Sequence, residues 1–498
     1  MFALPVATLA PNTPDFEMTP LVKPTGFREY DARWLFPSEI NLMGVQALGL
    51  GLGTLIHELG VRPDLVTGHD YRSYSLSIKQ ALTAGLMAAG VRVHDIGLAL
   101  SPTAYFAQFE LDCPCVAMVT ASHNENGWTG VKMGVARPLT FGPDEINQLK
   151  DIVMTGRGQA RAGGTYRFVP GMQGRYIRGL DGRKLSRPIK AVVACGNGTA
   201  GIFAPAALRQ IGVDVVELDC TPDYTFPRYN PNPEDMKMLH ALADAVKARR
   251  ADIGLAFDGD GDRCGIVDET GTEIFADKAG VLIARAFSTL HPGATFVADV
   301  KSTGLFATDP VLKKNGVKTD YWKTGHSYIK RRSFEIGAMA GFEKSGHFFF
   351  NAPFGKGYDD GIASAIAMLY TLDGANGMTM SALYASLPKT WSTPTMAPKC
   401  ADEVKYDVVD RVTAQYQAAE REGQRIAGQS IASLVTVNGI RVTLADGTWG
   451  LVRASSNKPS LVVVCESPAS DAQMRAMFAD IDARLGAIPE VGAYDQKI

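Results

Sequence analysis

Three pairs of apolar runs, each ending in a polar, glycine-rich loop, constrain the fold of this 498-residue chain more than any other feature. Apolar runs of about four to eight residues bounded by such loops are typical of buried strands. The same layout recurs three times at similar spacing, which indicates repeated units of similar size. The paired segments are 66–72 with 118–124, 192–198 with 255–263, and 296–304 with 337–347.

Helical periodicity separates the apolar runs. In the first unit, apolar runs at Leu65 and Val93 flank Ile78, Leu82 and Leu86, which recur every four residues and therefore share one helix face. Strands that alternate with helices favour an α/β fold with mixed, mostly parallel sheets. Ligands of open α/β sheets bind beyond the carboxyl ends of the strands, so we expect the glycine-rich loops to face one cleft.

The sequence changes character after about residue 390. Residues 390–400 are rich in Pro and Thr, which is typical of a linker. Shorter strand-like runs follow at 440–444 and 461–466. We therefore expect a fourth, smaller α+β domain, whose conspicuous polar loop is 452–460.

Composition argues against several classes of partner. Fifty basic and fifty-two acidic residues give a formal charge of −2, so there is no electrostatic reason to expect nucleic acid or an anionic membrane. No apolar run reaches the roughly 18 residues that a membrane helix needs. The apolar segment 1–11 lacks a basic n-region, so we interpret it as a loose tail rather than a signal peptide. Seven scattered cysteines without metal-type spacing are typical of reduced thiols in the cytoplasm.

The segment DGDGDR places Asp258, Asp260 and Asp262 at every second position after an apolar run. Three carboxylates so close together repel one another unless a cation is present, and oxygen ligands suit a hard divalent cation. An EF-hand loop is the nearest alternative, but its sixth position needs Gly and holds Arg263, and the flanking runs are typical of strands. The segment therefore predicts a metal site of another kind.

Two further loops leave their roles open. Ser122 follows the apolar run 116–119, and a serine in a surface loop is usually a turn residue. Gly196, Gly198 and Gly201 match the dinucleotide fingerprint GxGxxG, yet a tight turn from strand to helix explains the glycines equally well.

Polar loops in the second half of the chain hold residues that neither core packing nor helix amphipathicity explains. His326 and His347 lie beside glycines, and Glu343 and Ser345 share the second of these loops. Arg453 is followed by small hydrogen-bonding side chains, a composition suited to binding a phosphate through a bidentate guanidinium.

Together these motifs resemble the α-D-phosphohexomutase superfamily, and most closely its bacterial phosphomannomutase/phosphoglucomutase branch. The resemblance covers nearly the whole length and keeps the family order. Its segments are FREYDAR (27–33), TASHN (120–124), DGDGDR (258–263), EKSGH (343–347) and RASSNKP (453–459).

The resemblance implies a four-domain α/β architecture around a central cleft, with three related α/β domains of mixed, mostly parallel sheets and a smaller α+β C-terminal domain. The implied domains are a phosphoserine-loop domain over 1–168, a metal-binding-loop domain over 169–275, a sugar-specificity-loop domain over 276–388 and a phosphate-binding domain over 389–498.

The resemblance also implies an isomerase that interconverts hexose 1-phosphate and hexose 6-phosphate, with glucose or mannose as the sugar. Phosphoryl transfer would pass through a phosphoserine and a hexose 1,6-bisphosphate, with Mg2+ as the metal and glucose 1,6-bisphosphate as activator. The implied enzyme is cytoplasmic, is a monomer or weak dimer, and binds a small phosphosugar, with neither nucleic acid nor membrane as a partner.

Residue roles follow by resemblance from the matching segments. The implied catalytic residues are Ser122, Arg33, His123, Lys132 and His326. The implied metal ligands are Ser122, Asp258, Asp260 and Asp262. The implied substrate contacts are Tyr30, Arg263, Lys301, Glu343, Ser345, His347, Arg453, Ser455, Ser456 and Asn457.

The sequence departs from the usual pattern of this branch at several of these loops. His69 replaces an Arg, so we expect a weaker contact to the serine loop, and Glu125 replaces a Pro. Lys344 stands where Met is usual, and Tyr229 stands where His is common. Ser456 and Asn457 replace Asn and Thr. The alternatives at this point are a phosphoglucosamine mutase, a metal-dependent phosphatase that would not need Arg453, and a nucleotide-binding protein built on residues 196–201.

Overall fold

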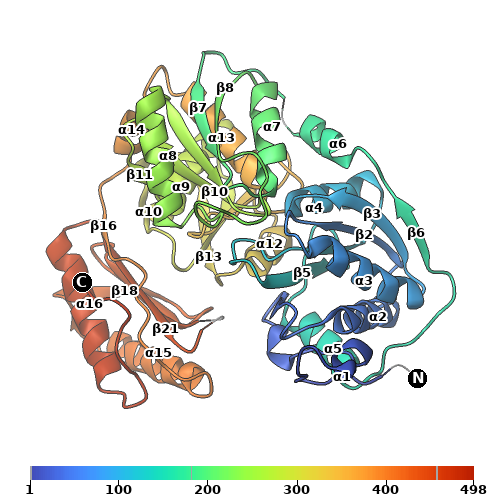
Figure 1. The fold of residues 1–498 in the computed structure, drawn as a ribbon. Coiled ribbons are helices and arrows are strands. Elements are labelled where there is room, and N and C mark those ends of the chain that lie inside the picture. The colour runs from blue at the N-terminus through green and yellow to red at the C-terminus, as the bar shows by residue number, and fades with distance from the viewer. Residues whose placement is uncertain (1–2, 181, 456–457) are drawn as a thin grey trace. The chain divides into compact units, whose positions relative to one another are not determined.

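The computed structural model describes residues 3–180, 182–455 and 458–498 (Figure 1). These residues form two compact units. Unit 1 comprises residues 1–276 together with 345–381, and unit 2 comprises residues 277–344 together with 382–498. The four predicted domain boundaries stay a prediction.

The first sheet of unit 1 has the strand order β1-β5-β4-β2-β3-β6. Its strands β2, β3, β4 and β6 are parallel, whereas β5 runs antiparallel to both β1 and β4. The bounds are β1 (Ala32–Leu35), β2 (Asp64–His69), β3 (Arg92–Leu98), β4 (Cys115–Val119), β5 (Trp128–Gly134) and β6 (Thr165–Phe168).

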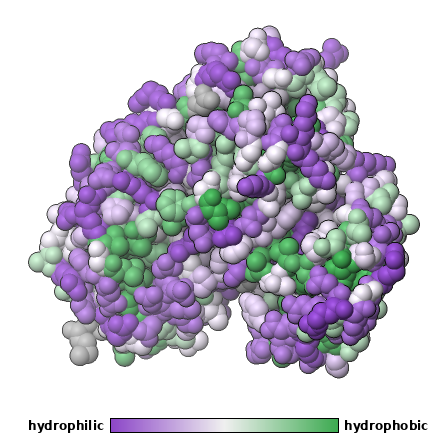
Figure 2. All heavy atoms as spheres, turned by 180° about the vertical axis from the view of Figure 1, so that it is seen from behind, coloured by the Kyte–Doolittle hydropathy of each residue, from purple (hydrophilic) through white to green (hydrophobic). Residues whose placement is uncertain are grey.

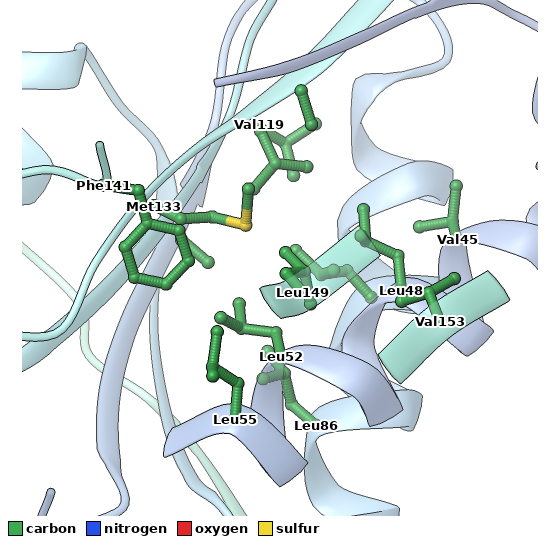
Figure 3. Packing of buried hydrophobic residues seen from close by; sticks show 14 of the residues in the cluster. Val45, Leu48, Leu52, Leu55, Leu86, Val119, Met133, Phe141, Leu149 and Val153 are labelled. Atoms are coloured by element: carbon green, nitrogen blue, oxygen red, sulfur yellow. The ribbon is translucent and has the colours of Figure 1, made fainter. Parts of the chain in front are cut away.

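Helices α2 (Leu42–Glu58), α3 (Ser75–Ala88) and α5 (Pro143–Met154) pack on one face of this sheet. Figure 3 shows leucines and valines from these helices directed toward Val119 of β4 and Met133 of β5. Burying each large aliphatic side chain contributes about 1.5–3 kcal/mol, so this cluster fixes the sheet that carries the loop after β4. Helix α4 (Ser101–Glu110) packs against β2 and β4 without joining the cluster.

The second sheet of unit 1 has the order β11-β10-β9-β7-β8. Strands β7, β8 and β9 are parallel, and β9, β10 and β11 form antiparallel hairpins. The bounds are β7 (Lys190–Ala194), β8 (Asp214–Leu218), β9 (Ile253–Phe257), β10 (Cys264–Asp268) and β11 (Glu273–Ile274), with helices α6 (Met172–Gly179), α7 (Ala204–Gln210), α8 (Met236–Arg249) and α13 (Gly361–Asp373) and the 3-10 helix η2 (Thr199–Ile202).

In unit 2, strands β13, β12 and β14 lie side by side and are parallel. The remainder of the unit is an antiparallel sheet of order β16-β21-β20-β19-β18-β17, whose core is completed by α15 and α16. The bounds are β12 (Thr295–Asp299), β13 (Lys318–Trp322), β14 (Ala340–Phe342), β16 (Trp391–Ser392), β17 (Arg425–Ile426), β18 (Gln429–Val435), β19 (Ile440–Leu444), β20 (Trp449–Ala454) and β21 (Leu461–Ser467), with α9 (Ala276–Leu290), α10 (Leu305–Thr308), α11 (Pro310–Lys314), α12 (His326–Glu335), α15 (Lys405–Arg421) and α16 (Asp471–Gly486).

Short elements complete the chain, and they are α1 (Pro14–Met18), η1 (Pro24–Gly26), β15 (Phe348–Phe350) and α14 (Met380–Ala385).

The repeated layout of the sequence is confirmed strand by strand. The first pair of loops follows β2 and β4, the second follows β7 and β9, and the third follows β12 and β14. In each pair the two strands are direct parallel neighbours. Because the carboxyl ends of parallel neighbours meet at one edge of a sheet, both loops of each pair lie at the same edge.

Two segments are more ordered than the sequence predicts. Residues 390–400, predicted as a linker, pair with the C-terminal sheet through β16 and through a bridge between Met396 and Val463. The apolar segment 1–11 was predicted as a loose tail, but its described part is tied down at Val6, whose backbone exchanges hydrogen bonds with Pro20 and Val22. Backbone pairing of this kind leaves no signature in the composition of either segment.

The surface and the thiols agree with the composition. On the face shown in Figure 2, polar residues dominate and apolar residues form smaller patches among them. All seven cysteines are free and buried. Within the described ranges, no helix combines the length and the apolar character that crossing a bilayer requires.

Asn41 anchors the N-terminal segment, which generates a first prediction. Its side chain accepts hydrogen bonds from the backbone N–H of Leu21 (2.9 Å) and of Gly44 (2.8 Å), and it donates to the carbonyls of Phe16 and Thr19. Asn41→Ala removes the cap of α2 and leaves a buried N–H unpaired, so we expect a loss of about 2–3 kcal/mol in a chemical denaturation experiment.

The matched control for this experiment is Asp235→Ala. Asp235 caps α8 through a single hydrogen bond to the N–H of Lys237, so its replacement costs about 1 kcal/mol. An Asn41→Ala loss no larger than that of the control would contradict the anchoring role.

Candidate active site

The loop after β4 holds Ser122 in a strained and buried position. Ser122 is 2% exposed, and its φ of 51° lies in the left-handed region that residues other than glycine rarely adopt. Its N–H donates to the hydroxyl of Thr120 at 2.8 Å. Its carbonyl lies against Gly259, where an added Cβ would come within 2.5 Å of the oxygen. The second sheet must therefore keep a glycine at 259 for the serine loop to fit.

A buried ion pair supports the same loop from the end of β2. Asp70 accepts a hydrogen bond from the hydroxyl of Thr120 (2.9 Å) and pairs with Arg72. The guanidinium of Arg72 donates to the carbonyls of Ser122 (3.0 Å) and Asn124 (2.7 Å). The charges satisfy each other while holding the main chain on both sides of His123, which stabilises the strained conformation of Ser122.

The sequence predicted a weaker contact between His69 and the serine loop, and in the structure another residue supports that loop. His69 Nδ1 lies 2.9 Å from the carbonyl of Gly97, whereas Arg72 donates to the carbonyls of the serine loop and supports it. Arg72 is a supporting residue that was not predicted from the sequence. Its only signal was a charged residue two positions after Asp70, in a loop predicted to border a site.

The three aspartates of DGDGDR lie in the turn between antiparallel strands β9 and β10, which agrees with the prediction of flanking strands. Asp258, Asp260 and Asp262 are all fully buried, and one carboxylate oxygen of each lies within 4.8 Å of the others. Such a cluster costs free energy through burial and through repulsion among like charges, unless cations offset it.

Asp258 connects this cluster to the serine. Its Oδ2 accepts a hydrogen bond from Ser122 Oγ at 3.0 Å and from Arg263 Nε at 3.1 Å. Arg263 also donates to Asn232 and pairs with Glu234 at 3.0 Å. The predicted serine and the predicted metal loop are therefore in direct contact.

Lys132 is the second cation in the cluster. From β5, its ammonium donates to Asp260 Oδ2 at 2.7 Å and pairs with Asp262, while Ser101 Oγ donates to Asp260 at 2.6 Å. Burial alone would lower the pKa of Lys132, but these two carboxylates raise it well above its usual value. Lys132 is therefore fully charged at neutral pH.

The carboxylates differ in how readily they ionise. Burial, then the charges of Asp262 and Asp260, raise the pKa of Asp258 to about 7. Burial also acts against ionisation of Asp260, yet Lys132 lowers the pKa of that carboxyl below its usual value. One member of the cluster therefore exchanges its proton near neutral pH.

The cluster fits a hard divalent cation. Among the residues that the structure describes, Asp260 Oδ1 and Asp262 Oδ1 are buried and have no hydrogen-bond partner. Buried carboxylate oxygens without partners are rare unless an ion satisfies them. Together with the adjacent Asp258 and the Ser122 hydroxyl, they offer the oxygen ligands that such an ion prefers.

Arg33 and His123 both make contacts at the serine loop. Arg33 extends from β1, where it donates to Asp31 at 2.9 Å and to Asn124 Oδ1 at 3.2 Å. His123 Nδ1 lies 3.2 Å from Ser122 Oγ. Burial, followed by the positive charges of Arg263 and Arg33, lowers the pKa of His123 well below its usual value. The imidazole is therefore neutral at pH 7 and suited to accept a proton.

His347 joins the same cluster from the segment 345–381 of unit 1. Its Nδ1 lies 3.1 Å from Asp359 Oδ2 and 3.7 Å from Asp262 Oδ1. A carboxylate on one ring nitrogen fixes the orientation and tautomer of a histidine, so the second nitrogen is presented in a defined direction. Asp359 was not predicted, because the acidic pair at 359–360 has no motif of its own.

In unit 2 the predicted residues gather at the carboxyl ends of β12, β13 and β14. Asp299, at the end of β12, is fully buried and accepts hydrogen bonds from Ser302, from Thr324 Oγ1 (3.0 Å) and from the N–H of Lys344 (3.3 Å). Each of these partners belongs to the loop after a different strand. A single unpredicted carboxylate therefore ties together the loops that carry Lys301, His326 and Glu343.

Glu343 is linked to the helix of His326. It is 2% exposed and accepts a hydrogen bond from the N–H of Gly325, the residue immediately before α12. Gly325 has a φ of 132°, which favours glycine. Glu343 and the buried His326 are thus held at the same end of the sheet.

The predicted phosphate loop begins at the end of β20. Arg453 and Ser455 are nearly buried there, with Arg453 Nη1 donating to the carbonyl of Ala454 at 2.8 Å. Lys405, at the start of α15, donates to the carbonyls of Ser455 (2.6 Å) and Lys458 (3.3 Å). The loop is therefore supported at both ends. Ser456 and Asn457 lie outside the described residues.

Three further predictions concern loops at the edge of these clusters. Tyr30 lies in the turn before β1, and Ser345 lies in the turn before His347. The glycines of GNGTAG have a packing role, since an added Cβ at Gly201 would come within 1.9 Å of the Cys220 carbonyl and one at Gly198 within 3.3 Å of Gly259. This close packing supports the interpretation as a tight turn.

Known protein families match consecutive segments of this chain. Four families match in sequence, described as phosphoglucomutase/phosphomannomutase alpha/beta/alpha domain I over residues 24–159, domain II over 175–271, domain III over 275–391 and the C-terminal domain over 399–484. The chain belongs to the phosphoglucomutase/phosphomannomutase family.

Similar relatives and structures agree with this family. The phosphomannomutase/phosphoglucomutase of Pseudomonas putida is 35% identical over 450 residues, covering 90% of this chain and 93% of the relative. The phosphoglucomutase of Neisseria meningitidis serogroup A is 32% identical, covering 89% and 92%. A family member from Burkholderia thailandensis superposes with a TM-score of 0.84 at 30% identity, covering 95% of this chain and 99% of that one.

The family assignment confirms the predicted fold class, which has three α/β parts and a C-terminal antiparallel sheet. It also supports a metal-dependent phosphohexomutase, in agreement with the acidic cluster. The roles of individual residues stay predictions.

The first prediction from this site concerns Arg72. Arg72→Met leaves Asp70 without its cation and removes two donors from the serine loop, so we expect turnover by this family member to fall about 10–100-fold. Arg72→Lys should restore part of the rate. The control is Arg92→Met, since Arg92 pairs with Asp64 on the exposed start of β3. Equal rates in all variants would refute a supporting role for Arg72.

A second prediction concerns divalent cation binding. Because the pKa of Asp258 is about 7, a cation must displace its proton below that pH. Calorimetry at a series of pH values measures the affinity of the protein for Mn2+. This affinity should rise about tenfold per pH unit up to about pH 7 and then level off. Asp258→Asn should bind more weakly and lose this dependence. Wild-type affinity that is unchanged between pH 5.5 and pH 8 would contradict the prediction.

Proposed function

We propose that this enzyme interconverts hexose 1-phosphate and hexose 6-phosphate, with glucose and mannose as the sugars, through a phosphoserine at Ser122. The names of the relatives from Pseudomonas and Neisseria support this activity, which makes the chain an isomerase of the intramolecular phosphotransferase type. The observation that carries the proposal is the contact of 3.0 Å between Ser122 Oγ and Asp258 inside the buried acidic cluster.

A phosphoryl group on Ser122 would bring roughly two negative charges beside three carboxylates, so the site requires additional positive charge. We infer Mg2+ as the resident metal, held by Asp258, Asp260, Asp262 and an oxygen on Ser122. When bound, the metal would neutralise phosphoryl oxygens and increase the electrophilicity of the phosphorus. The oxygen-only ligand set supports this choice.

The chain's own residues account for the other requirements of the transfer. In the forward step, the bond between phosphorus and Ser122 Oγ breaks as a sugar hydroxyl oxygen forms a new bond to phosphorus. Lys132 supplies fixed positive charge within the acidic cluster that Ser122 contacts, and Arg33 donates to Asn124 of the serine loop. Two histidines are suited to move the hydroxyl proton: His123 because its imidazole is neutral, and His347 because Asp359 orients its ring. His326 is a third candidate for this role.

The sugar must be held in two orientations, because either of its phosphate positions reacts. We assign the hydroxyl contacts common to both orientations to Glu343 and Ser345, with His347 nearby. Arg453, Ser455, Ser456 and Asn457 would bind the phosphate that does not react, and Lys301, Arg263 and Tyr30 are further substrate contacts. The support at both ends of the loop after Arg453 favours a mutase over a phosphatase, which needs no second phosphate site.

The remaining expectations rest on the same proposal. Glucose 1,6-bisphosphate would act as activator, because it phosphorylates Ser122 and leaves a hexose monophosphate. We propose a cytoplasmic monomer or weak dimer whose partner is a phosphosugar, without nucleic acid or membrane. Seven free, buried thiols support a reducing compartment.

The decisive assay measures conversion of glucose 1-phosphate and mannose 1-phosphate to the 6-phosphates, with Mg2+ and a trace of glucose 1,6-bisphosphate. Ser122→Ala should lower turnover by about 10³-fold or more, because no phosphoryl carrier remains. Removal of the metal with a chelator should abolish turnover, and Mg2+ should restore it. The ratio of the two rates identifies the preferred sugar.

Ser186→Ala is the matched control, since the hydroxyl of Ser186 donates to Asp373 at 2.8 Å away from the acidic cluster. It should retain the wild-type rate. Folded wild-type protein that converts neither sugar phosphate would overturn the proposal, and glucosamine phosphate would then test the phosphoglucosamine mutase alternative.

A further inference from the structure

Arg441 occupies an unusual position in unit 2. It lies on β19, is 2% exposed, and its guanidinium carbon is 4.0 Å from the ring centre of Tyr321 and 3.7 Å from that of Trp449. A guanidinium between two aromatic faces is held in one plane by cation–π attraction on both sides. The direction of its N–H groups is therefore fixed by the C-terminal sheet and by β13 together.

Those N–H groups hold the main chain on both sides of Lys301. Arg441 Nη1 donates to the carbonyl of Val300 at 2.8 Å and to the carbonyl of Ser302 at 2.7 Å. Both acceptors are buried, and a charged donor makes stronger hydrogen bonds than a neutral one. Arg441 thus sets the backbone from which the Lys301 side chain extends.

The C-terminal sheet also holds the far end of the same loop. Glu466 on β21 accepts hydrogen bonds through Oε1 from Thr303 Oγ1 and from the N–H of Gly304, each at 2.8 Å. Lys278 pairs with Glu466 and lowers its pKa to about 2, although burial opposes this, so the carboxylate stays charged. Side chains of the C-terminal sheet therefore hold both ends of the loop over 300–304, in addition to the contacts of Asp299 and Asp277.

The sheet that provides these contacts also carries Arg453. Side chains alternate along a strand, so Trp449, Leu451 and Arg453 of β20 share one face. Trp449 and Leu451 pack in one cluster with Val300, while Val452 belongs to the cluster under α15 and α16 on the opposite face. Arg453 therefore lies on the face of the sheet that receives the Lys301 loop.

We propose that Arg441 is a positioning residue that joins Lys301 to the C-terminal sheet, so that Lys301 and Arg453 meet the substrate as one preassembled pair of cations. The inference rests on the proposed function, because it takes Lys301 as a substrate contact. Fixing both cations before binding lowers the ordering cost that a charged substrate would otherwise have to offset. The partner of this pair is an anionic phosphosugar.

The test is a double-mutant cycle between Arg441 and Lys301 in the mutase assay. Arg441→Met should lower kcat/KM about 10–100-fold in the wild-type background. In the Lys301→Met background the same change should cost less than about threefold, because Arg441 acts through a side chain that is already absent. Equal costs in the two backgrounds would overturn the inference.

Arg484→Met is the matched control. Arg484 also belongs to the C-terminal part of the chain and stacks on a tyrosine, with its guanidinium carbon 4.2 Å from the ring centre of Tyr416, but it pairs with Asp480. It reports the effect of losing a stacked arginine without touching the Lys301 loop. Wild-type kcat/KM is expected for this variant, with Tm measured for both.

Hydrogen exchange provides a readout that does not depend on turnover. In folded Arg441→Met, amides in the segment 300–304 should exchange at least about tenfold faster than in wild type, whereas Arg484→Met should leave this segment unchanged. Arg441→Lys serves if the methionine variant fails to fold. Unchanged exchange at 300–304 would refute the positioning role. Absence of turnover in the wild type would instead refute the proposed function, so the two failures are distinct.

Discussion

Mutual repulsion among three buried carboxylates is the constraint on which the arrangement of unit 1 depends. Asp258, Asp260 and Asp262 each place one carboxylate oxygen within 4.8 Å of the others. Burial makes each uncompensated charge costly in free energy. Lys132 and Arg263 offset part of that charge, and two carboxylate oxygens remain for an ion. The serine loop is held at a fixed distance from this cluster by Asp70 and Arg72, as the proposed phosphoryl group on Ser122 requires.

Each unit contains a buried aspartate that accepts a hydrogen bond from the backbone of a neighbouring loop, in agreement with the repeated layout of the sequence. Asp70 follows the first strand of the first pair, and it accepts a hydrogen bond from the N–H of Ala121 in the loop after the second strand. Asp299 ends the first strand of the third pair, and it accepts one from the N–H of Lys344 in the corresponding loop. In both places a buried carboxylate sets the main chain of the neighbouring loop, and the side chains proposed to bind substrate inherit their positions from it.

Structural features that depend on a local sequence pattern could be predicted from the sequence. The paired runs predicted repeated α/β units with mostly parallel strands, and the spacing of Asp258, Asp260 and Asp262 predicted a metal-binding cluster of carboxylates. Contacts that join residues far apart in the chain left no such pattern. Arg72, Asp359 and Arg441 act through hydrogen bonds to residues at least 12 positions away in the chain. A lone charged residue looks the same in a sequence whether it faces solvent or a buried carbonyl. The attachment of the N-terminal segment at Val6 was missed for a similar reason, because it depends on backbone groups that every residue has.

The attachment of Lys344 has a consequence for how enzymes of this kind diversify. Asp299 holds this residue by its N–H, whereas its side chain is partly exposed and its ammonium lies 3.8 Å from Asp277. The path of the chain is therefore independent of which side chain stands between Glu343 and Ser345. A protein engineer can therefore vary charge, length or polarity at position 344, while the main chain of the neighbouring residues proposed to bind the sugar hydroxyls stays in place.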